Sequence, residues 1–455
     1  MFRNVPTHTA RRQLRATALC GLALLTTNAS ADVTSTESAA AQSAAETWAV
    51  HGQFTYVEQE TDRFRAPYAG PNSLSRAKGA ETIDATLYAG RALWPGAEAW
   101  INVEVDQGFG LDNTLGAAGF PSGEAYKVGK TEPYLRLTRS FVRQTWNLGH
   151  ARVPVAGGQN QLAGSQSADR VVFTVGKFGV ADVFDTNQYA HDPRGDFLNW
   201  AALDAATFDY AADAWGYSVG AALEWYTGMW VFRSGLFDLS DVPNSPHLDP
   251  GAHEFQSLLE VERRFRWRER SGRVLVTAYQ SHGRMGLLAD AVALSESSGA
   301  AADVAAVRRY RDRTGISLAL EQELTDDVGA FARVGGASGN VEVYEFTDVD
   351  RTATAGASLK GTRWGRPNDV VGGAAIVNEI SRERRDFLDH GGLGLLIGDG
   401  ALPHPASERI AELYYSLATG SFGHVALDYQ RIENPAYNHD RGPVSVFALR
   451  VHAQF

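Results

Sequence analysis

Segments in which apolar and polar residues alternate recur along most of this chain, and this alternation constrains the fold more than any other feature. In segment 97–106, one set of alternate positions is apolar: Ala97, Ala99, Ile101, Val103 and Val105. The positions between them include Glu98, Asn102, Glu104 and Asp106. A period of two residues is typical of β-strands whose two faces meet different surroundings. The sequence therefore predicts an all-β protein.

Sixteen segments share this pattern, a number that we favour over fourteen or eighteen. They lie near residues 48–57, 82–91, 97–106, 133–147, 170–179, 215–226, 229–238, 253–265, 273–281, 313–323, 328–338, 353–361, 369–379, 409–418, 423–432 and 443–455. Their connections alternate between long and short almost throughout, with tight turns at 94–96, 325–327 and 420–423. Long loops at one end and tight turns at the other, with an even strand number, predict a transmembrane antiparallel β-barrel. The connection 148–169 breaks this rule, because a short turn is expected there.

A barrel of this kind inverts the usual distribution of apolar residues. Every strand pairs with two neighbours, so that no unpaired backbone edge faces lipid. The apolar set of each strand then points outward, and the polar set lines a water-filled lumen. In segment 217–225, for example, the outward set would be Tyr217, Val219, Ala221, Leu223 and Trp225. Tyr and Trp near the strand ends are expected to form girdles at the membrane interfaces.

Residues 1–31 have the order of a secretion signal. A basic start, a short apolar core at 16–25 and the small residues Ala29-Ser30-Ala31 predict cleavage before Asp32. The apolar core is too short to cross a bilayer as a helix. The one cysteine, Cys20, belongs to this segment, so the mature chain is expected to carry no thiol through the oxidising periplasm.

The mature chain is expected to be one acidic domain. Residues 32–47 predict a short flexible N-terminus, and no linker interrupts 48–455, which we interpret as a single barrel domain. The signal carries four arginines: Arg3, Arg11, Arg12 and Arg15. Without these four, the 42 Lys and Arg become 38 against 53 Asp and Glu, a net charge of −15. Such a balance disfavours nucleic acid as a partner and polyanions as substrates.

The third long loop, 180–214, is the one most expected to fold into the lumen. It contains four large aromatic residues: Phe184, Tyr189, Phe197 and Trp200. An exposed loop rarely uses so many aromatics, whereas a loop folded inward would pack them against the barrel wall.

Several long motifs resemble those of one family. They include Gly176-Lys177-Phe178, Asp182-Val183-Phe184-Asp185-Thr186-Asn187, Tyr189-Ala190-His191-Asp192-Pro193-Arg194, Phe197-Leu198-Asn199-Trp200, Glu412-Leu413-Tyr414-Tyr415 and Asn434-Pro435-Ala436-Tyr437-Asn438. Together they resemble the carbohydrate-selective porins of the OprB type, over most of the mature chain. The resemblance implies a sixteen-stranded barrel that passes small sugars, often glucose, across the bacterial outer membrane.

The polar residues of loop 180–214 suit that chemistry. Sugar hydroxyls both donate and accept, so carboxylates, amides and arginines can hold them, while aromatic faces stack on the ring. The candidates for a constriction are Asp185, Asn187, His191, Asp192, Arg194, Asp196, Asn199 and Trp200, with Arg139 and Arg143 as a basic wall opposite. An alternative is that these residues only pin the loop, since Asp192-Pro193-Arg194-Gly195 is also a favourable β-turn.

Rival functions remain open on the sequence alone. An alginate-type channel for polyanions or uronates would need a basic lumen, which the net charge opposes. A barrel hydrolase would need a nucleophile and base on one face, and the chain has no G-x-S-x-G motif, so we expect no enzyme. A secreted β-sandwich adhesin is opposed by the loop asymmetry. His404 and His439 lack partners at metal-ligand spacing, so we expect neither metal nor cofactor.

Two segments of the strand pattern suggest partners in the membrane. Segment 443–455 ends in Phe455 and resembles the insertion signal read by the outer-membrane barrel-assembly machinery. The basic run 263–268 lies at a short turn and is expected to meet periplasmic headgroups, so lipid and lipopolysaccharide are expected neighbours. A monomer and a homotrimer are both compatible with the sequence.

Overall fold

The computed structural model describes residues 45–75, 79–125 and 129–455, which belong to the compact unit Ser43–Phe455. The predicted signal peptide and residues 32–44 of the predicted N-terminus lie outside these residues. The backbone N–H of Glu46 donates to the carbonyl of Ala163 (2.9 Å), and the carbonyl of Thr47 accepts from Ala92 (2.9 Å). Backbone hydrogen bonding therefore begins just before the first predicted strand.

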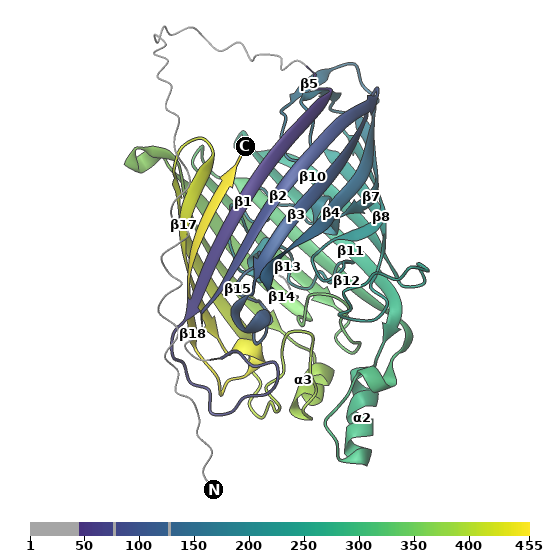
Figure 1. The fold of residues 1–455 in the computed structure, drawn as a ribbon, viewed down its shortest axis with the longest axis vertical. Helices are drawn as coiled ribbons and strands as arrows, with labels where there is room; N and C mark the ends of the chain where they lie inside the picture. The colour runs from purple at the N-terminus through teal and green to yellow at the C-terminus, as the bar shows by residue number, and fades with distance from the viewer. Residues whose placement is uncertain (1–44, 76–78, 126–128) are drawn as a thin grey trace. The chain divides into compact units, whose positions relative to one another are not determined.

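Within the described residues, sixteen antiparallel strands close into a barrel, which confirms the predicted fold class (Figure 1). The strands are β1 (Trp48–Thr61), β2 (Gly79–Trp94), β3 (Ala97–Gly108), β4 (Lys130–Asn147), β7 (Arg170–Phe178), β8 (Ser218–Thr227), β9 (Trp230–Asp238), β10 (Phe255–Trp267), β11 (Arg270–Met285), β12 (Arg309–Glu323), β13 (Val328–Ala337), β14 (Arg351–Gly361), β15 (Arg366–Glu379), β16 (Glu408–Ala418), β17 (Gly423–Glu433) and β18 (Val444–Gln454). Each pairs with its neighbours in chain order, and β1 pairs with β18.

The helices are short and belong to the long loops, except for the turn η4 in the short connection between β14 and β15. They are α1 (Trp200–Leu203), α2 (Leu288–Ser298) and α3 (Arg382–Asp389), with single turns η1 (Leu111–Asn113), η2 (Val180–Asp182), η3 (Ala305–Val307), η4 (Thr362–Trp364) and η5 (Pro435–Tyr437). Helices α2 and α3 lie at the end of the barrel opposite to the hairpin strand β5 (Figure 1). Across the described part of the chain, none of the helices has the length and apolar character needed to cross a membrane.

The two faces of the strands are arranged as the alternation predicts. In β1, Phe54 is exposed on the outside, whereas Thr55 and Gln59 are buried inside the barrel. Tyr217 is an exception: it precedes β8 and is buried, because its ring lies under the guanidinium of Arg139 (4.9 Å). The expectation that Tyr217 faces outward was therefore wrong, and the outward set of this strand begins at Val219.

Exposed aromatic residues gather at the end of the barrel that carries the short turns. They are Trp48, Trp94, Trp146, Trp225, Trp230, Trp267, Trp364, Phe422 and Phe455. Amphipathic rings at one height on the outer face form the girdle expected at a membrane interface. This end is the periplasmic one, because short turns face the periplasm in such barrels.

The irregular connection 148–169 is a two-stranded hairpin, β5 (Arg152–Val155) and β6 (Gly164–Ser167). Its tip returns to the barrel wall, and we call residues 156–163 the periplasmic lobe. The guanidinium of Arg143 donates to the carbonyl of Asn160 (2.9 Å), and the backbone N–H of Leu162 donates to Glu98 (3.2 Å). The lobe therefore lies against β3 and β4 at the periplasmic end.

Barrel closure depends on a close approach between β1 and the last residue of the sequence. The backbone N–H of Gly52 donates to the carbonyl of Phe455 (3.1 Å), and Phe455 donates back to Gly52 (2.9 Å). A Cβ at Gly52 would come within 2.4 Å of the Phe455 ring. Glycine at this position lets the aromatic side chain lie flat on the neighbouring strand.

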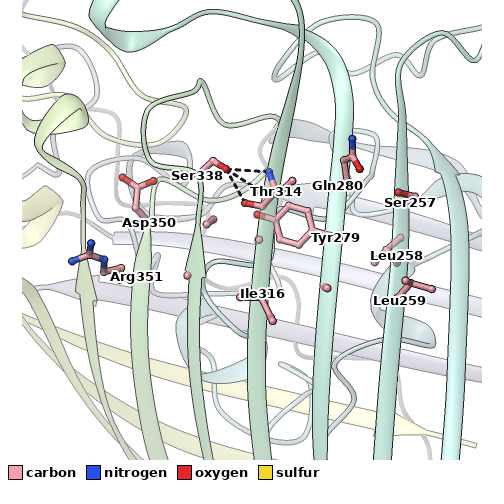
Figure 2. Close-up of a pocket in the computed structure, with 14 residues that line it drawn as sticks. Ser257, Leu258, Leu259, Tyr279, Gln280, Thr314, Ile316, Ser338, Asp350 and Arg351 are labelled. Carbon is pink, nitrogen blue, oxygen red and sulfur yellow. Dashed lines mark hydrogen bonds between the residues drawn. The ribbon is translucent and has the colours of Figure 1, made fainter.

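A groove of 680 Å³ marks the outer face near the loop end (Figure 2). Its exposed lining comes from outward positions of β10 to β14, among them Leu259 and Ile316. Small residues such as Ala278 and Gly336 make it deep, and the hydroxyls of Thr314 and Ser338 lie 3.1 Å apart at its edge. The lipid-facing surface is therefore indented at this height.

Candidate functional site

The loop between β7 and β8, residues 179–217 (hereafter L3), folds into the lumen as predicted. Two buried arginines on the barrel wall hold it. Arg333 of β13 donates to the carbonyls of Ala202 (2.8 Å) and Ala190 (2.9 Å). Arg450 of β18 donates to the carbonyl of Asp196 (2.8 Å). Charged donors that point at carbonyl oxygens form strong hydrogen bonds, so they fix the path of the loop.

Wall carboxylates hold the backbone N–H groups of the same loop. Glu412 of β16 accepts from Leu198 (2.5 Å), and Glu260 of β10 accepts from Asp185 (2.8 Å). Leu198 and Asp185 are both buried, so each of these carboxylates satisfies an N–H donor that would otherwise be costly to bury.

The second long loop also folds inward, a path that was not predicted from the sequence. Residues 109–125 (hereafter L2) bring the N–H groups of Ala118 (3.0 Å) and Gly119 (2.7 Å) to Glu408 of β16. L2 also bonds to L3, since the N–H of Gly123 donates to the carbonyl of Leu198 (2.7 Å). The two loops thus form one body inside the barrel.

A polar cluster forms where L3 faces β2, β3 and β4. We call it the lumen cluster; its members are Glu104, Arg136, Arg139, Asp182, Arg194 and Tyr217. Arg139 makes a two-pronged contact with Asp182 of L3 (2.6 and 2.7 Å). Arg136 contacts Glu104 (2.8 Å) and Asp106. The Arg139 pair joins the loop to the wall, and the Arg136 pairs join β4 to β3 beside it.

Arg194 is the central cation of the lumen cluster. Its guanidinium lies 3.0 Å from Glu124 of L2, 3.4 Å from Asp84 of β2 and 3.6 Å from Glu104 of β3. Its side chain is 15% exposed. Three carboxylates around one guanidinium fix its position and leave no excess positive charge there.

Eight of the ten predicted site residues fall into three groups, and Arg143 and His191 lie apart from them. Arg139 and Arg194 belong to the lumen cluster. Asp185, Asn187, Asn199 and Trp200 are buried between L3 and its surroundings. Asp192 and Asp196 bond to the backbone of their own turn, the first to the N–H of Arg194 (2.9 Å) and the second to that of His191 (3.2 Å). The interpretation of this segment as a turn is thereby confirmed.

The buried group is occupied by contacts within the protein. Asn199 caps α1 by accepting from Ala201 (3.0 Å) and donates to Gly119 (3.0 Å) and Gln430 (2.9 Å). The ring of Trp200 stacks on Phe120 of L2, with centroids 5.2 Å apart.

Arg143 is not part of the lumen cluster. It pairs with Glu98 (2.7 Å) beside the periplasmic lobe. Arg139 and Arg143 were predicted as one basic wall, but they contact different parts of the protein. Arg139 contacts L3, and Arg143 contacts the periplasmic lobe.

His191 links two parts of L3. Its Nε2 lies 3.0 Å from the carbonyl of Ala181, and its Nδ1 lies 3.3 Å from Asp204. Burial alone would lower the pKa of His191, but the hydrogen bond and charge of Asp204 outweigh it and raise the pKa to about 9. The imidazole is therefore protonated at neutral pH, and it holds the loop in its folded path.

One group of described residues has the chemistry to bind a metal ion. Ligand atoms of Asp249, His253 and Glu254 lie within 4.8 Å of one another in the loop between β9 and β10. The carboxylate of Asp249 accepts from the N–H groups of Gly251 (3.0 Å) and Glu254 (3.2 Å), as a turn-forming Asp does. The Nδ1 of His404 lies 2.9 Å from the carboxylate of Asp440.

Four members of the lumen cluster were not among the predicted site residues: Glu104, Arg136, Asp182 and Tyr217. Glu104 and Arg136 occupy inward positions of β3 and β4, so the alternation places them in the lumen. The sequence contains no signal for the height at which L3 meets this wall. Only the folded loop brings Asp182 to Arg139.

The fold and the lumen together define a class of protein. A closed barrel with an apolar outer face and a lumen narrowed by two inward loops is the architecture of a porin, a channel of the bacterial outer membrane. The family follows from the sequence match: the model of the carbohydrate-selective porin family, OprB, covers residues 74–455. The chain belongs to this family.

A solved structure shares this fold at low sequence identity. OprB of Pseudomonas putida, in its high-pH structure, is 15% identical, with a TM-score of 0.66, over 90% of this chain and 94% of that chain. OccAB1 of Acinetobacter baumannii is 11% identical, with a TM-score of 0.48, over 91% of this chain and 99% of that chain. A comparison with curated protein sequences found no match.

Proposed function

We propose that the chain is a passive outer-membrane channel selective for small neutral sugars such as glucose. The observation that carries this proposal is the composition of the lumen cluster. Arg136, Arg139 and Arg194 each contact carboxylates, so donors and acceptors stand side by side and no excess of cations remains. A polyol needs both kinds of group at once, whereas a selective anion pore needs an excess of cations.

Aromatic rings complete the proposed sugar path. Tyr217 lies under Arg139 (4.9 Å), and Trp215 lies under Arg136 (4.8 Å), so each ring is held in place by a cation. Tyr217 is buried, whereas Trp215 is half-buried, so the ring of Trp215 can offer a flat apolar face to the C–H face of a sugar. We propose Arg139, Arg194 and Trp215 as sugar contacts, and Asp185, Asn199 and Trp200 as residues that hold L3.

The alternative, a channel for uronates or other polyanions, is disfavoured by the same pairing of charges. The proposed transport is diffusion with weak binding and involves neither a catalysed step nor a cofactor. Residues 1–31 are proposed to be removed on export, and Phe455 to be read during barrel assembly.

Single-channel recording in planar bilayers tests the proposal. Open-channel current that millimolar glucose or maltose partly blocks is the expected result. A protein without channel activity would contradict the function outright. Block by uronate polymers but not by neutral sugars would assign the channel to polyanions instead.

A further inference from the structure

A second polar cavity lies on the periplasmic side of L3, away from the lumen cluster. It has a volume of 580 Å³, within the range typical of small-molecule sites. Its roof comes from L3, and its wall from β10, β11 and β12. The lining residues that matter here are Gln188, Tyr189, Glu262, Arg264, Arg273 and Glu321.

The basic run 263–268, expected at the membrane headgroups, contributes to this cavity. Alternation along β10 turns Arg264 inward, beside the buried Glu262 (2.6 Å), while Arg263 lies over the outer ring of Trp230 (5.1 Å). The expectation that the whole run meets headgroups was therefore wrong for Arg264.

The roof of the cavity is fixed to its wall. Arg273 of β11 donates to the carbonyl of Thr186 (2.9 Å), and Glu321 of β12 accepts from the backbone N–H of Gln188 (2.8 Å). The ring of Tyr189 lies on Gly329 of β13, where an added Cβ would come within 1.9 Å of it. The position of the aromatic ring is thus set by a glycine on the wall.

The carboxylates of the cavity are neutralised and held in place. Glu262 accepts from Arg264 (2.6 Å), Arg233 (2.9 Å) and Arg273 (3.2 Å), and Arg273 also contacts Glu321 (2.6 Å). Paired charges hold these side chains rigidly, so the surface presents hydrogen-bond donors and acceptors in fixed positions.

Two polar side chains have hydrogen-bonding capacity to spare. The side chain of Gln188 is exposed, and that of Arg264 is 46% exposed with only its Nε engaged by Glu262. Both face a cavity that also presents the partly buried ring of Tyr189. An amide, a guanidinium and an aromatic face are the groups that hold a pyranose ring.

We propose that this cavity is a second saccharide subsite, at which a neutral sugar pauses after passing L3. The inference rests on the proposed function, because it assigns a further station to the same substrate. The sugar ring stacks on Tyr189, and its hydroxyls bond to Gln188 and Arg264. Successive weak sites keep a permeating molecule bound without trapping it, because each is left for the next.

The test is block of the channel by glucose added to one side only. The double variant Gln188→Ala with Arg264→Met removes the free donors and leaves Glu262 paired with Arg233 and Arg273. With glucose on the periplasmic side, the apparent Kd for block is expected to rise about tenfold, the loss of one strong hydrogen bond. Block from the loop side, which meets the lumen cluster first, is expected to change less than about twofold.

The matched control is Arg263→Met, one residue away on the outward face, which is expected to leave block from either side unchanged. If glucose blocks the wild-type channel and the double variant with the same apparent Kd, the subsite is overturned and the proposed function stands. A wild-type channel that glucose does not block overturns both. If the double variant fails to assemble, Gln188→Ala alone, at an exposed loop position, gives the same test, with a weaker expected shift in the same direction.

Discussion

Replacement of Arg333 by methionine removes the main anchor of L3 and tests whether this loop sets the width of the channel. The Arg333 side chain is fully buried, donates to three carbonyls of L3 and lies 3.7 Å from Asp185. Methionine fills similar space but cannot donate. The variant therefore leaves Asp185 buried without its cation.

The magnitude follows from this lost pair. Removing one partner of a buried ion pair costs about 3–5 kcal/mol. At about 1.4 kcal/mol per tenfold, the equilibrium between the seated and the displaced loop shifts by roughly 100-fold or more. The barrel itself is expected to remain folded, because its strand pairing does not involve the Arg333 side chain.

Single-channel recording and gel mobility distinguish these effects. The Arg333→Met channel is expected to show a larger and noisier conductance and weaker glucose block, while the unheated protein still migrates as a folded barrel. The control is Arg351→Met, at an exposed outward position of β14. A variant with wild-type conductance, noise and block would refute the argument that this contact holds the constriction.

Three further predictions concern the lumen, the loop and the barrel seam. Arg139→Met is expected to weaken glucose block about tenfold and to raise cation selectivity, since Asp182 loses its counter-ion; reversal potentials in a salt gradient measure the selectivity, with Arg143→Met as control. The pKa of His191 is raised to about 9, so the stability it gives to L3 is complete below about pH 6.5 and is lost as the pH rises through 9. Current noise should therefore increase over this range in the wild type and not in His191→Gln, and equal pH profiles would contradict the assignment. Gly52→Val is expected to displace the Phe455 ring at a cost of about 1–3 kcal/mol and to lower the yield of folded barrel. Gly158→Ala, where an added Cβ meets no atom within 4 Å, is expected to leave the yield of folded barrel unchanged. Equal yields from both variants would argue against the contact between Gly52 and Phe455.

The strands could be predicted because the membrane imposes a rule on each of them separately. Ile101 and Val105 must face lipid and Glu104 must not, whatever the neighbouring strands do. The aromatic content of the third loop similarly predicted its inward path, since Phe197 and Trp200 need a surface to pack against. These inferences use only residues close together in the chain.

The partners of the loop could not be predicted in this way. Arg333 and Arg450 appear in the sequence as ordinary inward residues of distant strands, and nothing local marks them as anchors. Alternation predicted the side of the wall for Arg136, but the meeting of Arg139 with Asp182 depends on the depth at which L3 is seated. The inward path of L2 was missed because its small residues, such as Ala118 and Gly119, carry no aromatic signal.

The anchors of L3 also determine an order of events during assembly. The wall groups that hold the backbone of the loop run from Glu260 to Arg450, and these anchors follow L3 in the chain, whereas Arg139, which holds Asp182, precedes it. When L3 emerges, the strands that carry its backbone anchors have not yet formed. The loop can take its final place only after β18 has joined the sheet, so the narrow passage is the last part of the molecule to form. The time course of conductance in newly inserted channels therefore reports the rate of the final step of folding.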